Sequence, residues 1–127
     1  MIRVELTVNG ERESLSVGAT QTLLDVLRSQ LALTGAKLGC NQGVCGSCTV
    51  LIDGVPARAC LTLAAGCRDR AITTIEGVAG GATPSAVQQA FIEAGAVQCG
   101  YCTPGMVLAA EALLRRTSKP TVPQIRE

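Results

Sequence analysis

The chain opens on alternating apolar and polar residues, the pattern of a strand with one buried face. The apolar positions of this first segment are Ile2, Val4, Leu6 and Val8. Asn9-Gly10 then supplies a two-residue hairpin signal, and a second strand over 12–17 would place Leu15 and Val17 on the same core side. The pattern therefore predicts an N-terminal β-hairpin.

The period changes after residue 20, where leucines recur at helical spacing. These are Leu23, Leu24, Leu27 and Leu31. Thr22, with Asp25 three residues later, is suited to cap the start of this helix. We expect the helix to end before Gly35.

Strand patterns return over 49–52 and 55–59, joined by an Asp53-Gly54 turn, and again near 71–75. Two hairpins with a helix between them predict a mixed sheet that is covered on one face by a helix, an α+β arrangement.

Residues 76–83 are small enough to be a linker, and helical patterns follow them. Thr83-Pro84 is suited to start one helix that ends at Gly95, and Thr103-Pro104 to start another. The expected buried stripe of the first helix is Val87, Ala90, Phe91 and Ala94. The expected buried stripe of the second is Met106, Ala109, Ala110, Leu113 and Leu114.

The amino-acid composition restricts both the core and the kinds of partner that the chain can bind. Aromatic residues make up only 2% of the 127 residues, so the core must be built from Leu, Val, Ile and Ala. A net charge of +1 gives no electrostatic footprint for nucleic acid or for an anionic membrane.

The N-terminus starts directly on a strand pattern and Glu111 interrupts the last apolar run, so we expect neither a secretory signal nor membrane insertion. A cytoplasmic, reducing location follows.

The residues with the clearest chemistry lie in the segment 39–48. Cys40, Cys45 and Cys48 are spaced as C-x4-C-x2-C and Cys60 follows eleven residues later, which is the plant-type arrangement of ligands to a [2Fe–2S] cluster. Three glycines in the segment leave room for the backbone to take positive φ and to wrap closely around an inorganic core. They are Gly39, Gly43 and Gly46.

Other uses of these thiols remain open. Disulfides need an oxidising compartment, and the count of seven cysteines is odd. An all-thiolate zinc site would need Cys45 and Cys48 together with a second pair. The chain contains no His, which excludes Rieske-type ligation and removes the usual general base. We expect Cys67 to be a buried thiol rather than a ligand.

A second pair of cysteines, Cys99 and Cys102, lies just before the expected helix at residue 103. The N–H groups and dipole at a helix N-terminus favour a thiolate or an anionic cluster. The C-x2-C spacing alone also fits a redox dithiol, half a zinc site or two packed thiols.

Together, these motifs resemble a known family. The run 40–50, Cys60 and the run 98–106 are similar, in this order, to the iron–sulfur subunit of the molybdenum hydroxylases, the xanthine oxidase family. The similarity spans essentially the whole chain. That family includes aldehyde oxidoreductases, carbon monoxide dehydrogenases and dehydrogenases of N-heterocycles.

The resemblance implies a β-grasp, ferredoxin-like [2Fe–2S] domain over 1–76, a linker over 77–83 and a small helical-bundle domain over 84–127. It implies two [2Fe–2S] clusters. Cys40, Cys45, Cys48 and Cys60 would bind the first, with Gly43 and Gly46 shaping its loop. Cys99 and Cys102 would be two ligands of the second, and Gln98 would lie near the pterin.

The resemblance also implies a function. The chain would be the electron-transfer subunit of a molybdenum-containing oxidoreductase, without substrate chemistry of its own. Electrons would pass from molybdopterin on a large subunit, through the clusters, to FAD on another subunit or to another acceptor. The alternatives are a stand-alone [2Fe–2S] ferredoxin and a zinc-stabilised interaction module.

The chain departs from the family pattern at its end. Family members complete the second cluster with a C-x-C pair after a helix that begins much like 120–127, and this sequence contains no such pair. Thr121 and Gln124 form a plausible capping box at the start of that helix. We therefore expect the sequence to be truncated.

Overall fold

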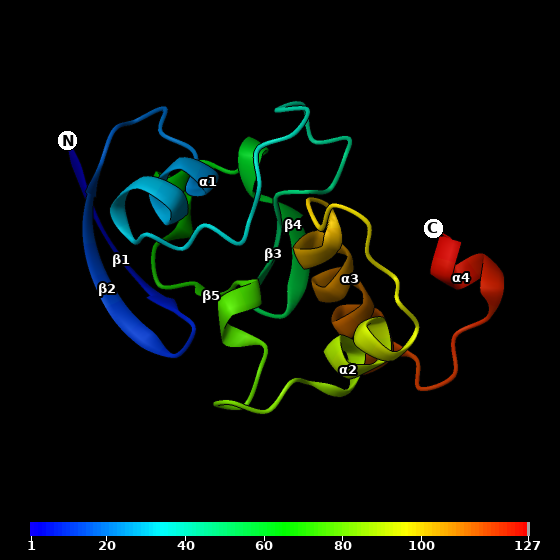
Figure 1. The fold of residues 1–127 in the computed structure, drawn as a ribbon. Coiled ribbons are helices and arrows are strands. Elements are labelled where there is room, and N and C mark those ends of the chain that lie inside the picture. Colours follow the sequence, from blue (N-terminus) through cyan, green and yellow to red (C-terminus); the bar gives the residue numbers. More distant parts are fainter. Residues whose placement is uncertain (127) are drawn as a thin grey trace.

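A computed structural model describes residues 1–126 of the chain. Its centre is a five-stranded sheet (Figure 1) with strand order β2-β1-β5-β3-β4. The strands are β1 (Ile2–Val8), β2 (Glu11–Val17), β3 (Thr49–Ile52), β4 (Val55–Arg58) and β5 (Ala71–Thr73). Strand β5 pairs parallel with β1 and antiparallel with β3, so the sheet is mixed, as the sequence predicts.

The N-terminal hairpin has the expected turn. Asn9 and Gly10 have φ values of 51° and 84°, which are the positive values that a type I′ turn requires at both central positions. Asn9 also reaches the segment after β5, because its side-chain amide donates to Thr74 Oγ1 at 2.8 Å and its carbonyl accepts from Thr74 N–H at 2.9 Å. The hairpin turn is therefore tied to the segment that follows the neighbouring strand β5.

The expected first helix forms over 23–30, as α1 (Leu23–Asp25) followed by a π-helical turn (Val26–Gln30). The Thr22 hydroxyl accepts from Asp25 N–H at 3.1 Å, which confirms the predicted cap. The helix packs its leucines against the sheet, where they join the apolar residues of β1 and β2 in the main core.

The other face of the sheet is covered at its β3–β4 end by helix α3 (Thr103–Arg116), as Figure 1 shows. A small second core forms there from Leu51 of β3 with Leu108 and Ala112 of α3. Alternation along β3 explains the two cores, since Val50 points into the main core and Leu51 into the second.

Helix α2 (Ala86–Glu93) starts later than the sequence suggests. Its N-cap is Ser85 and not Thr83, because Ser85 and Gln88 form a complete capping box. Thr83 pairs instead with Gly80 through two backbone hydrogen bonds. Of the expected apolar stripe only Val87 is buried, whereas Gly95 has φ +60° and ends the helix as expected.

The predicted buried face of α3 is wrong. The buried residues are Gly105, Val107, Leu108 and Ala112, whereas Met106 is 54% and Leu114 43% exposed. Both sets have helical spacing, and the contact with the sheet selects the set that includes the small Gly105. The N-cap is Cys102, one residue before the expected Thr103.

The last helix, α4 (Val122–Arg126), begins at the predicted capping box, in which Thr121 N–H donates to Gln124 Oε1 at 2.8 Å. Glu127, which belongs to the same expected helix, lies outside the described residues. None of the helices within residues 1–126 has the length and apolar character needed to cross a lipid bilayer.

Candidate metal centre

The loop from Gly39 to Cys48 has little regular structure and lies between the first helix and β3, next to the start of α3 (Figure 1). Cys40 is half-buried, Cys45 exposed and Cys48 buried. Cys60 is carried by a short 3-10 turn, Ala59–Leu61, directly after β4. The β3–β4 hairpin therefore returns the chain to the loop, as the sequence predicts.

Backbone N–H groups surround the Cys40 sulfur. The N–H groups of Gln42, Val44 and Cys45 approach Cys40 Sγ at 3.3, 3.2 and 3.2 Å. These hydrogen bonds, the one from Cys45 above all, lower the pKa of the Cys40 thiol to about 6. The loop thus favours a thiolate at this position.

Cys45 is held in the same way. Its sulfur accepts from the N–H groups of Cys40 and Ser47, each at 3.4 Å, and these bonds lower the pKa of the Cys45 thiol. A methyl group on Gly39 would lie only 2.7 Å from Cys45 Sγ. Gly39 is therefore needed for close approach, although its φ is not positive.

Cys48 and Cys60 form a second, buried pair. Cys60 N–H donates to Cys48 Sγ at 3.4 Å, and both side chains are at most 5% exposed. Burial, with the neighbouring Cys48 thiol, raises the pKa of Cys60. Within residues 1–126 no three potential ligands converge closely enough to hold one metal ion. The four thiols are instead arranged as an outer pair and an inner pair.

Two glycines give the loop its shape. Gly43 and Gly46 have φ values of +77° and +79°, in the region that residues with a Cβ rarely adopt. A methyl group on Gly43 would also meet the Leu61 side chain at 2.3 Å. Asn41 adopts a positive φ of 55° as well, which the sequence did not indicate.

The second cysteine loop touches the first. A methyl group on Gly105, in the first turn of α3, would lie 2.2 Å from the carbonyl oxygen of Gly46. The Tyr101 hydroxyl donates to the Leu38 carbonyl, just before the first loop. These contacts place the two cysteine-bearing segments side by side.

The other candidate residues differ in their exposure. Cys99, Cys102 and Gln98, the candidate residues of the second site, are exposed. Cys67 is buried in the sheet domain, where its thiol donates to the Leu63 carbonyl at 3.5 Å and burial raises its pKa, as expected for a packed thiol.

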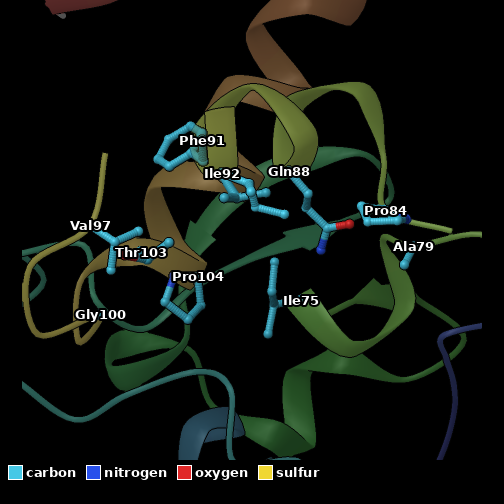
Figure 2. Close-up of a pocket in the computed structure, with 11 residues that line it drawn as sticks. Ile75, Ala79, Pro84, Gln88, Phe91, Ile92, Val97, Gly100, Thr103 and Pro104 are labelled. Carbon is cyan, nitrogen blue, oxygen red and sulfur yellow. The ribbon is translucent and has the colours of Figure 1, made fainter. Parts of the chain in front are cut away.

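An apolar groove of about 510 Å³ adjoins the second cysteine loop (Figure 2). It is bounded by Ile75, Pro84, Phe91 and Val97, with Pro104 at the start of α3. Neither Cys99 nor Cys102 lines it, so the groove is a neighbour of the second site and not part of it.

Sequence reasoning missed the roles of three residues at the first site. The Thr49 hydroxyl donates to the Gly46 carbonyl at 2.7 Å, the Arg58 guanidinium donates to that hydroxyl at 2.8 Å, and Gly105 packs against the same carbonyl. Arg58 lies two residues before Cys60 in a short strand, and Gly105 lies inside a helix, where glycine costs stability. That unfavourable glycine was the available signal of a close packing contact.

Two protein families match this chain, one over its sheet part and one over its helical part. Residues 6–71 match the family described as "2Fe-2S iron-sulfur cluster binding domain", and residues 74–127 match the "[2Fe-2S] binding domain" family. The chain therefore contains two [2Fe–2S]-binding domains.

Relatives agree over nearly the full chain. The nicotinate dehydrogenase small FeS subunit of Eubacterium barkeri is 48% identical over 98% of this chain and 79% of the relative. The aldehyde oxidoreductase of Megalodesulfovibrio gigas is 44% identical over 100% of this chain and 14% of the relative. Among solved structures, quinoline 2-oxidoreductase from Pseudomonas putida 86 superposes with a TM-score of 0.95 at 43% identity, covering 98% of this chain and 77% of that one.

A ferredoxin-like mixed sheet with one cysteine loop, followed by helices with a second cysteine loop before α3, defines the class of iron–sulfur electron-transfer proteins. The chain belongs to the family of small iron–sulfur subunits of the molybdenum hydroxylases. Its role is electron transfer within a molybdenum-containing oxidoreductase.

Proposed function

We propose that the chain carries electrons from a molybdopterin centre on a large partner subunit, through two [2Fe–2S] clusters, to FAD on another partner subunit or to another acceptor. Each cluster takes up and releases one electron when bound. This chain holds the clusters, sets their surroundings and positions them between the partners.

The observation that carries the proposal is the pairing of the thiols in the first loop. Cys40 and Cys45 form the outer pair, and their sulfurs accept five backbone N–H groups between them. Cys48 and Cys60 form the inner pair. Two pairs of thiolates would suit a [2Fe–2S] cluster, since Cys40 with Cys45 and Cys48 with Cys60 could each hold one iron.

The second cluster is proposed for the helical part of the chain. In this proposal Cys99 and Cys102 supply two of its ligands, and Gln98 is near the pterin of the partner subunit. The N-terminus of the 14-residue helix α3 directly follows Cys102, which favours anionic sulfur there.

Exposed apolar residues beside the first loop support docking of a protein acceptor. Val44 is 75% and Leu61 62% exposed, and both lie next to the accessible outer pair of cysteines. Apolar side chains on that rim favour a protein partner over free solvent. The nearly neutral net charge favours neither nucleic acid nor a membrane as the partner.

The proposed domain division is a β-grasp domain over 1–76, a linker over 77–83 and a small helical bundle from 84 onward. The cytoplasm is the proposed location, because thiolate ligands need a reducing compartment.

Purification under native conditions tests the proposed partners. The chain, carrying an affinity tag and expressed in its own host, is expected to co-elute with two larger chains that contain molybdopterin and flavin. Elution as a lone iron–sulfur monomer would indicate a free ferredoxin instead. Zinc without acid-labile sulfide would indicate an interaction module.

A further inference from the structure

The Arg58 side chain lies under the first cysteine loop without a carboxylate partner. Within residues 1–126 the ion pairs are made by Arg12 and Arg70, and Arg58 makes none. Its Nε is buried and finds no acceptor among the described residues. A methyl group on Gly46 would lie 3.6 Å from the guanidinium carbon. A positive charge without a counter-ion is thus held against the loop.

A continuous chain of hydrogen bonds leads from this charge to a cysteine sulfur. The Arg58 guanidinium donates to Thr49 Oγ1 at 2.8 Å, and the Thr49 hydroxyl donates to the Gly46 carbonyl at 2.7 Å. That carbonyl belongs to the same peptide unit as the Ser47 N–H, which donates to Cys45 Sγ at 3.4 Å.

Each bond in such a chain strengthens the next, because a donor on a peptide carbonyl draws electron density away from the N–H of the same unit. A more positive N–H stabilises negative charge on the sulfur that it faces. Hydrogen bonds to the sulfurs are one of the main influences on the potential of an iron–sulfur cluster.

We propose that Arg58 is a positioning residue that raises the reduction potential of the first cluster, acting on the Cys45 sulfur through Thr49 and the Gly46–Ser47 peptide. The inference rests on the proposed function, because it takes Cys45 to be a ligand of that cluster. One-electron reduction adds one negative charge to the cluster and its thiolates. The chain from Arg58 therefore favours the reduced state.

The loop has other supports that keep its shape without Arg58. The Thr49 N–H also donates to the Gly46 carbonyl at 3.1 Å, and Gly105 of α3 packs against the same oxygen. Loss of the arginine should therefore change the potential of a cluster that still assembles.

The test is a redox titration of the native assembly, with the first cluster followed by electron paramagnetic resonance. Its signal is identified as the one that is missing in Cys45→Ser. In Arg58→Gln we expect the ratio of reduced to oxidised first cluster, at a fixed solution potential, to fall roughly threefold, or about 28 mV at about 59 mV per factor of ten. Arg58→Lys keeps the positive charge, so its ratio of reduced to oxidised first cluster should lie between those of Arg58→Gln and the wild type.

Arg12→Gln is the matched control. Arg12 lies on β2, the edge strand opposite to β4, and its charge is paired with Glu5 and Asp69. Its replacement should leave the ratio at the wild-type value. An equal fall in Arg12→Gln would show that general surface charge sets the potential, and would overturn the role given to Arg58.

Thr49 provides the second test. Thr49→Val removes the hydroxyl from a buried side chain and keeps its shape, so it should lower the ratio, whereas Thr49→Ser should not. If Arg58→Gln fails to assemble, the comparison of Thr49→Val with Thr49→Ser tests the inference by itself. In the double variant Arg58→Gln/Thr49→Val, the ratio should fall no further than in either single variant, since both substitutions interrupt the same series of hydrogen bonds.

Wild-type ratios in both Arg58→Gln and Thr49→Val would overturn the inference, as would independent, additive falls. Absence of any [2Fe–2S] signal in the wild-type assembly would instead contradict the proposed function itself. The two failures are thus distinguishable.

Discussion

At the residue scale, the backbone of the first loop stabilises negative charge on a cysteine sulfur even without a bound metal. Cys40 receives N–H groups from residues 42, 44 and 45, and its thiol pKa falls to about 6. Cys60 has a raised pKa because it is buried. Backbone N–H groups thus favour the thiolate form of Cys40, whereas burial disfavours the thiolate form of Cys60, so metal binding must help Cys60 to lose its proton.

Cys45→Ser tests the assignment of the ligands. We expect this variant to lose or severely destabilise the first cluster, because serine removes one of four thiolates. Visible absorption with iron and sulfide analysis measures the loss. Cys67→Ala is the control, since Cys67 is buried outside the loop and should not affect cluster content. Unchanged absorption in Cys45→Ser would contradict the assignment.

Gly39→Ala tests the close approach of the loop backbone to Cys45. The added methyl group would lie 2.7 Å from the sulfur, and overpacking of this kind costs about 1–3 kcal/mol. We expect the cluster to be lost to an iron chelator about tenfold faster or more. Gly66→Ala is the control, because a methyl group there meets nothing within 4 Å. Equal rates in the two variants would refute the steric argument.

At the element scale, the sequence correctly predicted a hairpin turn and two helix caps, which depend on interactions between neighbouring residues. The Asn9-Gly10 turn, the Thr22 cap and the Thr121 capping box each depend on residues within three positions, and all three are present. The buried face of α3 depends on a sheet whose residues are distant in sequence. Its hydrophobic positions allow two faces, so periodicity alone could not choose between them.

Leu108→Ala tests the observed face of α3. Leu108 is 1% exposed in the second core, and loss of a buried leucine costs about 2–5 kcal/mol. We expect the free energy of unfolding to fall by this amount in denaturant titration. Met106, on the same helix and 54% exposed, provides the control. A larger loss of unfolding free energy in Met106→Ala than in Leu108→Ala would show that the face predicted from the sequence is the buried one.

At the scale of the whole molecule, two contacts join the cysteine-bearing segments: Gly105 with Gly46 and Tyr101 with Leu38. The motifs alone did not indicate this proximity, because each motif is local and the residues in contact, Gly46 and Gly105, are 59 positions apart. The sequence identified the candidate ligands by their spacing. Arg58 belongs to no motif, and although Thr49 directly follows Cys48, only the fold shows that these two side chains support the loop.

Gly105→Ala tests the junction. A methyl group 2.2 Å from the Gly46 carbonyl must push α3 away from the loop, at a cost of about 1–3 kcal/mol. We expect a lower free energy of unfolding and slower electron transfer between the clusters. Gly80→Ala, where the methyl group meets nothing within 4 Å, should retain the wild-type transfer rate. A wild-type transfer rate in Gly105→Ala would show that this contact does not set the spacing.

The central claim is that four cysteines, arranged as two pairs on a glycine-shaped loop, hold a [2Fe–2S] cluster that passes electrons. The most direct measurement is electron paramagnetic resonance of the reduced protein, in the wild type and in Cys45→Ser. We expect a [2Fe–2S] signal in the wild type that is absent from the variant. A wild type that shows no such signal, even after anaerobic reconstitution with iron and sulfide, would contradict the claim.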